Sequence, residues 1–233
     1  MKTIIPAGIL LLAGALFAAD STPKDEIVAA GKKLEKEGNY SWKSTVEFGN
    51  FTGTTDGKVK DGVTCLSMEF GDNTTQAFLK GDKGAVKAPD QEWQSLEEIT
   101  AAAGNERGPR QFLARRLKSF KSPAEEVVDL AGKAKDLKKE GDVYSSDLTE
   151  AGAKELLSFG GRRRGNAPEP KNAKGSVKFW TKDGSISKYQ VNVQGSMTFN
   201  GEDRDIDRTT TVEVKDVGST KLEIPEAAQK KMS

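Results

Sequence analysis

The longest regular pattern in the sequence is an alternation of apolar and polar residues near the C-terminus, and it limits the folds open to this chain. Apolar side chains, with one glycine among them, occupy every odd position from Tyr189 to Phe199. Successive side chains of a strand point to opposite faces, so this pattern predicts one long strand with a single buried face. The segments 40–48 and 65–70 show the same alternation at even positions. A chain with several such strands folds around a sheet that has one apolar face.

Turn signals separate these strands closely enough for hairpins, which predicts an antiparallel sheet. We expect turns at 54–62 and 71–75, and a turn at 81–82 between two further short strands. A turn at Lys182-Asp183-Gly184 leads into the long alternating strand, and the stretch DIDRTTTVEVKDVG supplies another strand after it. The chain is expected to end in a short exposed tail after Pro225.

Helix signals fall before and between the two groups of strands. Ser21 or Thr22 caps a predicted helix from Lys24 to Glu37, and residues 91–134 are predicted to be helical. Two short strands around residue 141 and a short helix ending near residue 157 follow. Helices and antiparallel strands in separate blocks indicate the α+β class. No internal repeat occurs, so we expect one domain over residues 20–233, with a flexible Gly/Arg/Pro loop at 158–173.

The first nineteen residues read as a secretory signal peptide. Lys2 precedes an apolar run from Ile4 to Ala19 that is too short for a membrane span. We expect cleavage after Ala19, with cleavage after Ala18 or an uncleaved anchor as the alternatives. The protein is therefore expected to be periplasmic or extracellular, with no integral membrane span after cleavage.

Charge and residue usage exclude several classes of function. Of the 36 basic residues only Lys2 lies in the leader, so 35 basic residues remain against 35 acidic ones, a balance that argues against nucleic acid as a partner. The sequence has no histidine and one cysteine, Cys65, which excludes a Ser-His-Asp triad, an intrachain disulfide and a His- or Cys-based zinc site. We expect Cys65 to occupy a buried strand position. No catalytic residue, metal site or cofactor is predicted.

Two basic segments are candidate contacts for anions. The helix RGPRQFLARRLKSFK is predicted to bury Phe112 with its leucines and to expose its arginines, either as a solvated face or as a contact for acidic lipid headgroups or an acidic partner. The loop SFGGRRRGNAPEP follows a helix and contains prolines that a central strand excludes. We interpret this segment as a connecting loop, in which Arg162, Arg163 and Arg164 contact an anionic headgroup or partner.

The order of elements resembles the bacterial lipoprotein-carrier (LolA/LppX-like) superfamily. The segments that carry the likeness are VKFWTKDGSISKYQVNV, with Trp180 and Lys188 on either side of its hairpin, VYSSDLTEAGAKELL, and TTTVEVKDVGSTKLEIPEAA, which ends with an Asp-x-Gly turn and an Ile-Pro pair. The resemblance implies a strongly curved antiparallel sheet, an incomplete β-barrel, with helices covering the concave side. It further implies a hollow that holds the acyl chain of a lipid or lipoprotein.

The sequence therefore supports an exported, non-enzymatic protein that binds or carries a lipid or lipoprotein acyl chain in the envelope. The alternative is an envelope structural or interaction protein with a closed core, no ligand and an envelope protein as its partner. An enzyme is the third possibility, and the missing histidine and thiol pairs argue against it. The residues expected to form the apolar lining are Trp42, Val46, Phe48, Leu66, Met68, Phe70, Val191, Val193, Met197 and Phe199.

Overall fold

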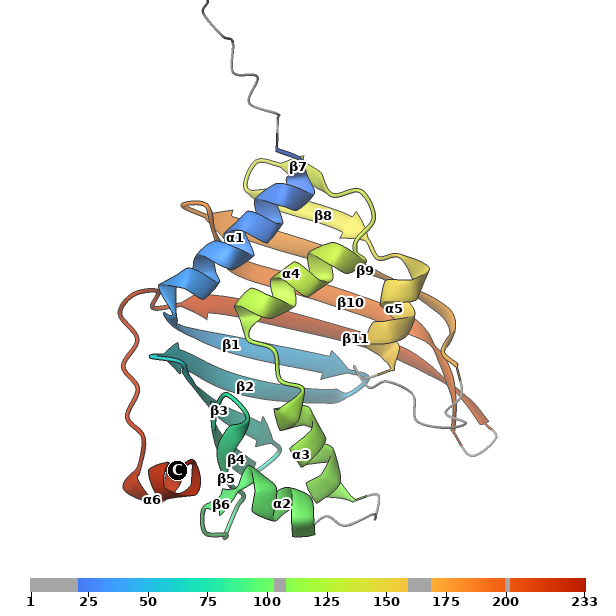
Figure 1. The fold of residues 1–233 in the computed structure, drawn as a ribbon. Coiled ribbons are helices and arrows are strands. Elements are labelled where there is room, and N and C mark those ends of the chain that lie inside the picture. Colours follow the sequence, from blue (N-terminus) through green and yellow to red (C-terminus); the bar gives the residue numbers. More distant parts are fainter. Residues whose placement is uncertain (1–20, 103–107, 159–168, 200–201) are drawn as a thin grey trace, which may run out of the picture.

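The computed structural model describes residues 21–102, 108–158, 169–199 and 202–233 (Figure 1). Its helices are α1 (Pro23–Glu37), α2 (Leu96–Ala102), α3 (Pro109–Lys118), α4 (Pro123–Lys133), α5 (Glu150–Leu157) and α6 (Glu226–Lys231). Its strands are β1 (Asn39–Phe48), β2 (Phe51–Lys60), β3 (Val63–Phe70), β4 (Asn73–Lys80), β5 (Lys83–Lys87), β6 (Gln94–Ser95), β7 (Lys138–Glu140), β8 (Val143–Asp147), β9 (Lys171–Lys182), β10 (Ser185–Phe199) and β11 (Glu202–Lys215). The α+β class is confirmed.

All the strands join one antiparallel sheet with 11 strands in the order β6-β5-β4-β3-β2-β1-β11-β10-β9-β8-β7. The sheet is curved and does not close, because β6 and β7 form its two edges (Figure 1). The pairing of β1 with β11 brings the N-terminal and C-terminal groups of strands together at the centre. The helices α1, α4 and α5 lie across one face of the sheet, which we call the helical face; the opposite side is the outer face (Figure 1).

Local signals start the helices where the sequence predicts. Thr22 caps α1 and Ser122 caps α4, each in a reciprocal capping box with the acidic residue three positions later. Helices α1 and α4 pack together closely at Gly31, where an added Cβ would lie 3.0 Å from Val128 and 3.1 Å from the Ala124 carbonyl oxygen. The main core lies between these helices and the sheet. Within the described residues, no helix has the length and apolar composition needed to cross a membrane.

Several sequence-based predictions of local structure are wrong. Residues 73–75 of the turn predicted at 71–75 begin β4, and residues 94–95 of the segment predicted to be helical form β6. Residues 54–60 belong to β2, and the reversal comes at Asp61-Gly62, where both residues have positive φ angles. Residues 171–173 of the predicted loop are the first residues of β9. The C-terminal tail is not an exposed end, because α6 packs on β5 and its Ala228 is fully buried.

A second, smaller core explains the position of the C-terminal segment. On the outer face of β3, β4 and β5, Val63, Phe78 and Ala85 form an apolar cluster with Trp93 and with Ala228 of α6. The tail covers these residues because an uncovered patch containing Phe and Trp would leave a large apolar area in water. The sheet is thus covered on its helical face by most of the helices and, at one end, on its outer face by the chain terminus.

Candidate functional site

Strand register brings the predicted lining residues to the helical face. Trp42 pairs with Gly57, which in turn pairs with Leu66, so Trp42 and Leu66 share a face. Val46 and Val191 both pair with Thr210 of β11, one from each side. Directly paired residues of an antiparallel sheet project to the same side. The alternation in the sequence therefore identifies the inward positions of β1, β3 and β10.

Half of the ten predicted residues are core side chains covered by helices. Trp42, Leu66, Met68, Val191 and Val193 are all buried within the main cluster. The ring of Trp42 stacks on Phe120, which follows α3, with ring centroids 6.2 Å apart. At these positions the helices already occupy the space above the sheet.

The other described members form a less covered region, which we call the open end: Val46, Phe48 and Met197, together with the neighbouring Phe51. Val46 and Met197 are partly exposed, Phe48 is 41% exposed and Phe51 is 44% exposed. Phe48 and Phe51 pair directly across the β1–β2 hairpin. The side chains of Phe70 and Phe199 lie outside the described structure. Apolar side chains of the helical face are therefore accessible at the open end, whereas those beneath the helices are buried.

A polar cluster lies beside the open end. Arg208 of β11 pairs with Phe48 on one side and with Val193 on the other, and its Nη2 donates to the Leu156 carbonyl oxygen at 2.7 Å. The Tyr189 hydroxyl donates to Glu126 Oε2 of α4 at 2.5 Å. Glu126, Arg116 of α3 and Arg208 act electrostatically on one another. The three charged groups therefore lie close together, although they come from three different elements.

Burial controls the protonation of this cluster. Desolvation raises the pKa of Glu126 above its usual range, although the hydrogen bond from Tyr189 opposes this shift. Desolvation and the nearby Glu126 carboxylate hold the pKa of Tyr189 well above its usual value. Desolvation by the surrounding protein lowers the pKa of Arg208 and of Arg116, although the Arg116 side chain is partly exposed to solvent. Both guanidinium groups remain cationic at neutral pH.

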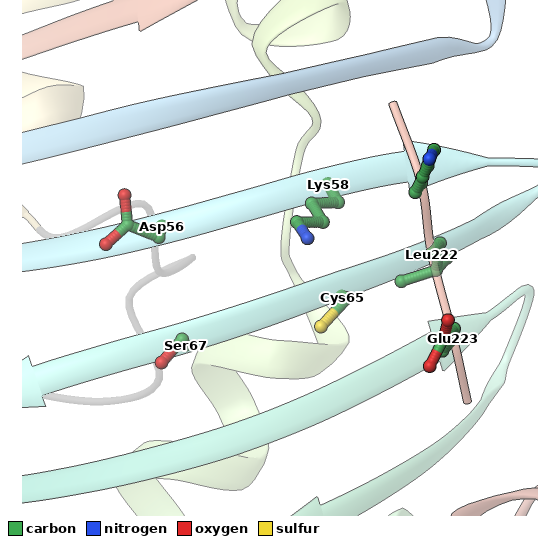
Figure 2. Close-up of a pocket in the computed structure, with 7 residues that line it drawn as sticks. Asp56, Lys58, Cys65, Ser67, Leu222 and Glu223 are labelled. Carbon is green, nitrogen blue, oxygen red and sulfur yellow. The ribbon is translucent and has the colours of Figure 1, made fainter. Parts of the chain in front are cut away.

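The two best-defined hollows lie away from the predicted lining. The first, of about 380 Å³, is on the outer face between β2, β3 and the C-terminal segment, and Figure 2 shows Lys58 and Cys65 on its neighbouring strands. Burial raises the pKa of the partly exposed Cys65 thiol, which makes it a poor nucleophile at neutral pH. The second, of about 330 Å³, lies beside α2 and α6, where Lys231 pairs with Glu98 at 2.8 Å. Polar and charged side chains predominate in the lining of the second hollow.

Some features of the site were not predicted from the sequence. Phe112 was expected to be buried, but it is 59% exposed on α3, because Ala114 and Leu117 point to the core instead. Arg208 lies two residues after Ile206 on β11, so both side chains belong to the helical face. An arginine at such an inward position was the feature of the sequence that could have identified this residue. Across the described residues, no group of three or more Cys, Asp or Glu side chains is arranged to hold a metal ion. Arg162, Arg163 and Arg164 lie outside the described residues.

Comparison with known proteins adds no assignment. No protein-family model matches the sequence, and no curated protein matches it. The solved structures compared include the crystal structure of a bifunctional dehydratase-cyclase domain in ambruticin biosynthesis, with 12% identity over 82% of this chain and 81% of that chain. The TM-score of that pair is 0.16, which is too low to support an argument about fold or function.

Proposed function

We propose that the protein is an exported, non-enzymatic binding protein of the cell envelope that takes up an acyl chain of a lipid or lipoprotein at the open end. A single contrast carries the proposal: on the same face of β1, Trp42 is 4% exposed and Phe48 is 41% exposed. The predicted signal peptide supports export, and an open antiparallel sheet with helices on one face supports the half-barrel arrangement implied by the lipoprotein-carrier resemblance.

The size of the open end favours partial uptake of the chain. Covering about six methylene groups there contributes about 5 kcal/mol, at roughly 0.8 kcal/mol for each group. That free energy alone corresponds to a dissociation constant on the order of 0.1 to 1 mM. Held only in this way, an acyl chain is bound weakly and reversibly, as a carrier requires. Tighter binding would require the helices to move away from the buried residues, such as Leu66 and Val193.

The test combines detection of bound ligand with a variant that blocks the open end. Purified protein is analysed by native mass spectrometry and titrated with a fluorescent fatty acid. Val46→Arg places a charge on the helical face, whereas Thr45→Arg places the same charge on the outer face of the same strand. We expect Val46→Arg to weaken fatty-acid binding at least tenfold and Thr45→Arg to leave it unchanged, with circular dichroism verifying that both variants fold. Absence of uptake by the wild-type protein in both assays refutes the proposal.

A second candidate is an envelope structural or interaction protein with no ligand. The five buried lining residues and the polar lining of the second hollow favour it. Crosslinking in the envelope from a photoreactive residue at position 48 distinguishes the two. A discrete protein adduct without fatty-acid uptake supports the interaction function, whereas uptake that Val46→Arg abolishes supports the acyl-binding function.

A further inference from the structure

Helix α3 differs in charge from every other helix that the structure describes. Its ten residues, PRQFLARRLK, contain Arg110, Arg115, Arg116 and Lys118 and no acidic residue. By comparison, α1 carries four lysines and four acidic residues, α2, α4 and α5 each carry more acidic than basic residues, and α6 has two lysines and one glutamate. The chain as a whole is nearly neutral. The positive charge of α3 is therefore a local concentration that the composition does not reveal.

Helix stability explains only part of this charge. Cations in the last turn of a helix interact favourably with its dipole, and Arg115, Arg116 and Lys118 occupy that turn. Arg110, however, lies in the first turn, where a cation is unfavourable and where the structure has no acidic residue and no side-chain cap. Helix stability therefore does not account for the positive charge of the first turn.

The outward face of α3 combines two of these cations with an exposed aromatic ring. Phe112 is 59% exposed, and Arg115 and Arg116 follow at three and four residues, which places them on the same side of the helix. Ala114 and Leu117 on the opposite side are buried, so core packing fixes which side faces outward. This face adjoins the open end, because Arg116 interacts electrostatically with Arg208, the residue that pairs with Phe48.

We propose that the outward face of α3 docks the protein on an anionic lipid surface. Clustered cations attract such a surface, and a single exposed phenylalanine among them is suited to insertion at the boundary between headgroups and acyl chains. A stable protein interface needs an apolar centre and about 800 Å² from each partner, whereas this face presents one aromatic side chain on a ten-residue helix. The inference goes beyond acyl binding and does not depend on it, but docking here would present the open end to the membrane.

The expected strength follows from the charges. Each cation near an anionic surface strengthens binding about fivefold at moderate ionic strength. Reversing two of them should therefore weaken binding at least about twentyfold. The effect should shrink as salt is added, because the Debye length falls from about 10 Å at 0.1 M to about 3 Å at 1 M. Loss of the Phe112 ring should weaken binding by about fivefold, which reflects partial insertion of one side chain.

The experiment measures sedimentation of the purified protein with vesicles of phosphatidylglycerol and phosphatidylcholine, and with vesicles of phosphatidylcholine alone. The test variant carries Arg115→Glu and Lys118→Glu, two exposed cations that lie three residues apart on α3. The control carries Lys32→Glu and Lys36→Glu on α1, which gives the same net charge at exposed sites on another helix. We expect binding to the anionic vesicles only, its loss in the α3 variant, and its retention in the control. Phe112→Ser is expected to give the intermediate result.

Three outcomes would overturn the inference: equal binding to both kinds of vesicle, no binding to either, or equal losses in the α1 and α3 variants. Binding to an acidic polypeptide such as polyglutamate, without binding to anionic vesicles, would assign the helix to an acidic protein partner instead. Fatty-acid titration of the α3 variant separates the two proposals. Normal fatty-acid uptake by the α3 variant together with lost vesicle binding supports docking by α3 and leaves acyl binding intact. Wild-type protein that binds anionic vesicles but takes up no fatty acid refutes only the acyl-binding proposal.

Discussion

The two ends of β1 show how differently one face of one strand is used. Trp42 lies directly over Gly57 and stacks on Phe120, and it is 4% exposed. Phe48, six residues further on the same face, has Phe51 and Arg208 as its cross-strand neighbours and is 41% exposed. Alternation along a strand therefore specifies which face a side chain joins. Whether that side chain becomes core or accessible surface depends on elements that arrive from other parts of the chain.

The largest expected effect is at the sealed end. Leu130 of α4 is 0% exposed in the main core, so Leu130→Ala should lower the free energy of unfolding by about 3 kcal/mol through lost burial and a residual cavity. Urea unfolding monitored by circular dichroism measures this change. A loss below about 1 kcal/mol would mean that the helices are loosely packed on the sheet, and the contrast between the two ends would disappear.

The second prediction concerns the contact beneath Trp42. A Cβ at Gly57 would lie 2.1 Å from the Trp42 ring, so Gly57→Ala should cost about 2 kcal/mol as the indole is displaced. Gly132 in α4 is the matched control, because a Cβ there has no neighbour within 4 Å and its φ is not positive. Gly132→Ala should raise stability by about 0.5 kcal/mol through helix propensity. Equal effects of the two substitutions in urea unfolding would contradict this packing.

These positions also show what the sequence could and could not predict. Residues 54–60 resemble a turn because they contain Asp56 and Gly57, but Gly57 is needed in β2 to accommodate the Trp42 ring. That requirement comes from a neighbouring strand and is invisible in the local pattern. The helices were predictable because their signals are local, as the hydrogen bonds between Ser95 and Glu98 before α2 show.

The candidate site was less predictable because its groups come from distant segments. The inward positions of β1, β3 and β10 follow from alternation, and the structure places them on one face. The partners of Arg208 cannot be deduced in the same way, since Glu126 and Arg116 reach it only through the packing of α3 and α4. Phe112 and Leu113 are equally apolar neighbours, and only the orientation of α3 leaves the ring of Phe112 exposed.

The third prediction uses the polar cluster between the two ends. Tyr189→Phe removes the donor to Glu126 and should cost roughly 1.5 kcal/mol at pH 7. The folded-state pKa of Glu126 is raised above its unfolded value, so its contribution to stability is complete below the unfolded pKa and is lost as pH rises through the folded pKa. The cost of Tyr189→Phe should therefore grow with pH in that window. Urea unfolding between pH 4 and 8 measures this dependence, with Glu126→Gln as the reference that lacks it. Identical pH profiles of the wild type and Glu126→Gln would contradict the raised pKa.

The smallest effect on stability, and the most informative for function, is expected at the open end. Phe48→Ala should cost only about 1 kcal/mol, since the ring is partly in water and its main apolar partner is the cross-strand Phe51. If acyl chains bind there, the same substitution should weaken fatty-acid affinity about fivefold, whereas Leu130→Ala should leave the affinity of the folded protein unchanged. Urea unfolding and fatty-acid titration of both variants provide the comparison. Greater destabilisation by Phe48→Ala than by Leu130→Ala would show that the Phe48 ring is part of the core. The open end would then not differ from the sealed end of the sheet.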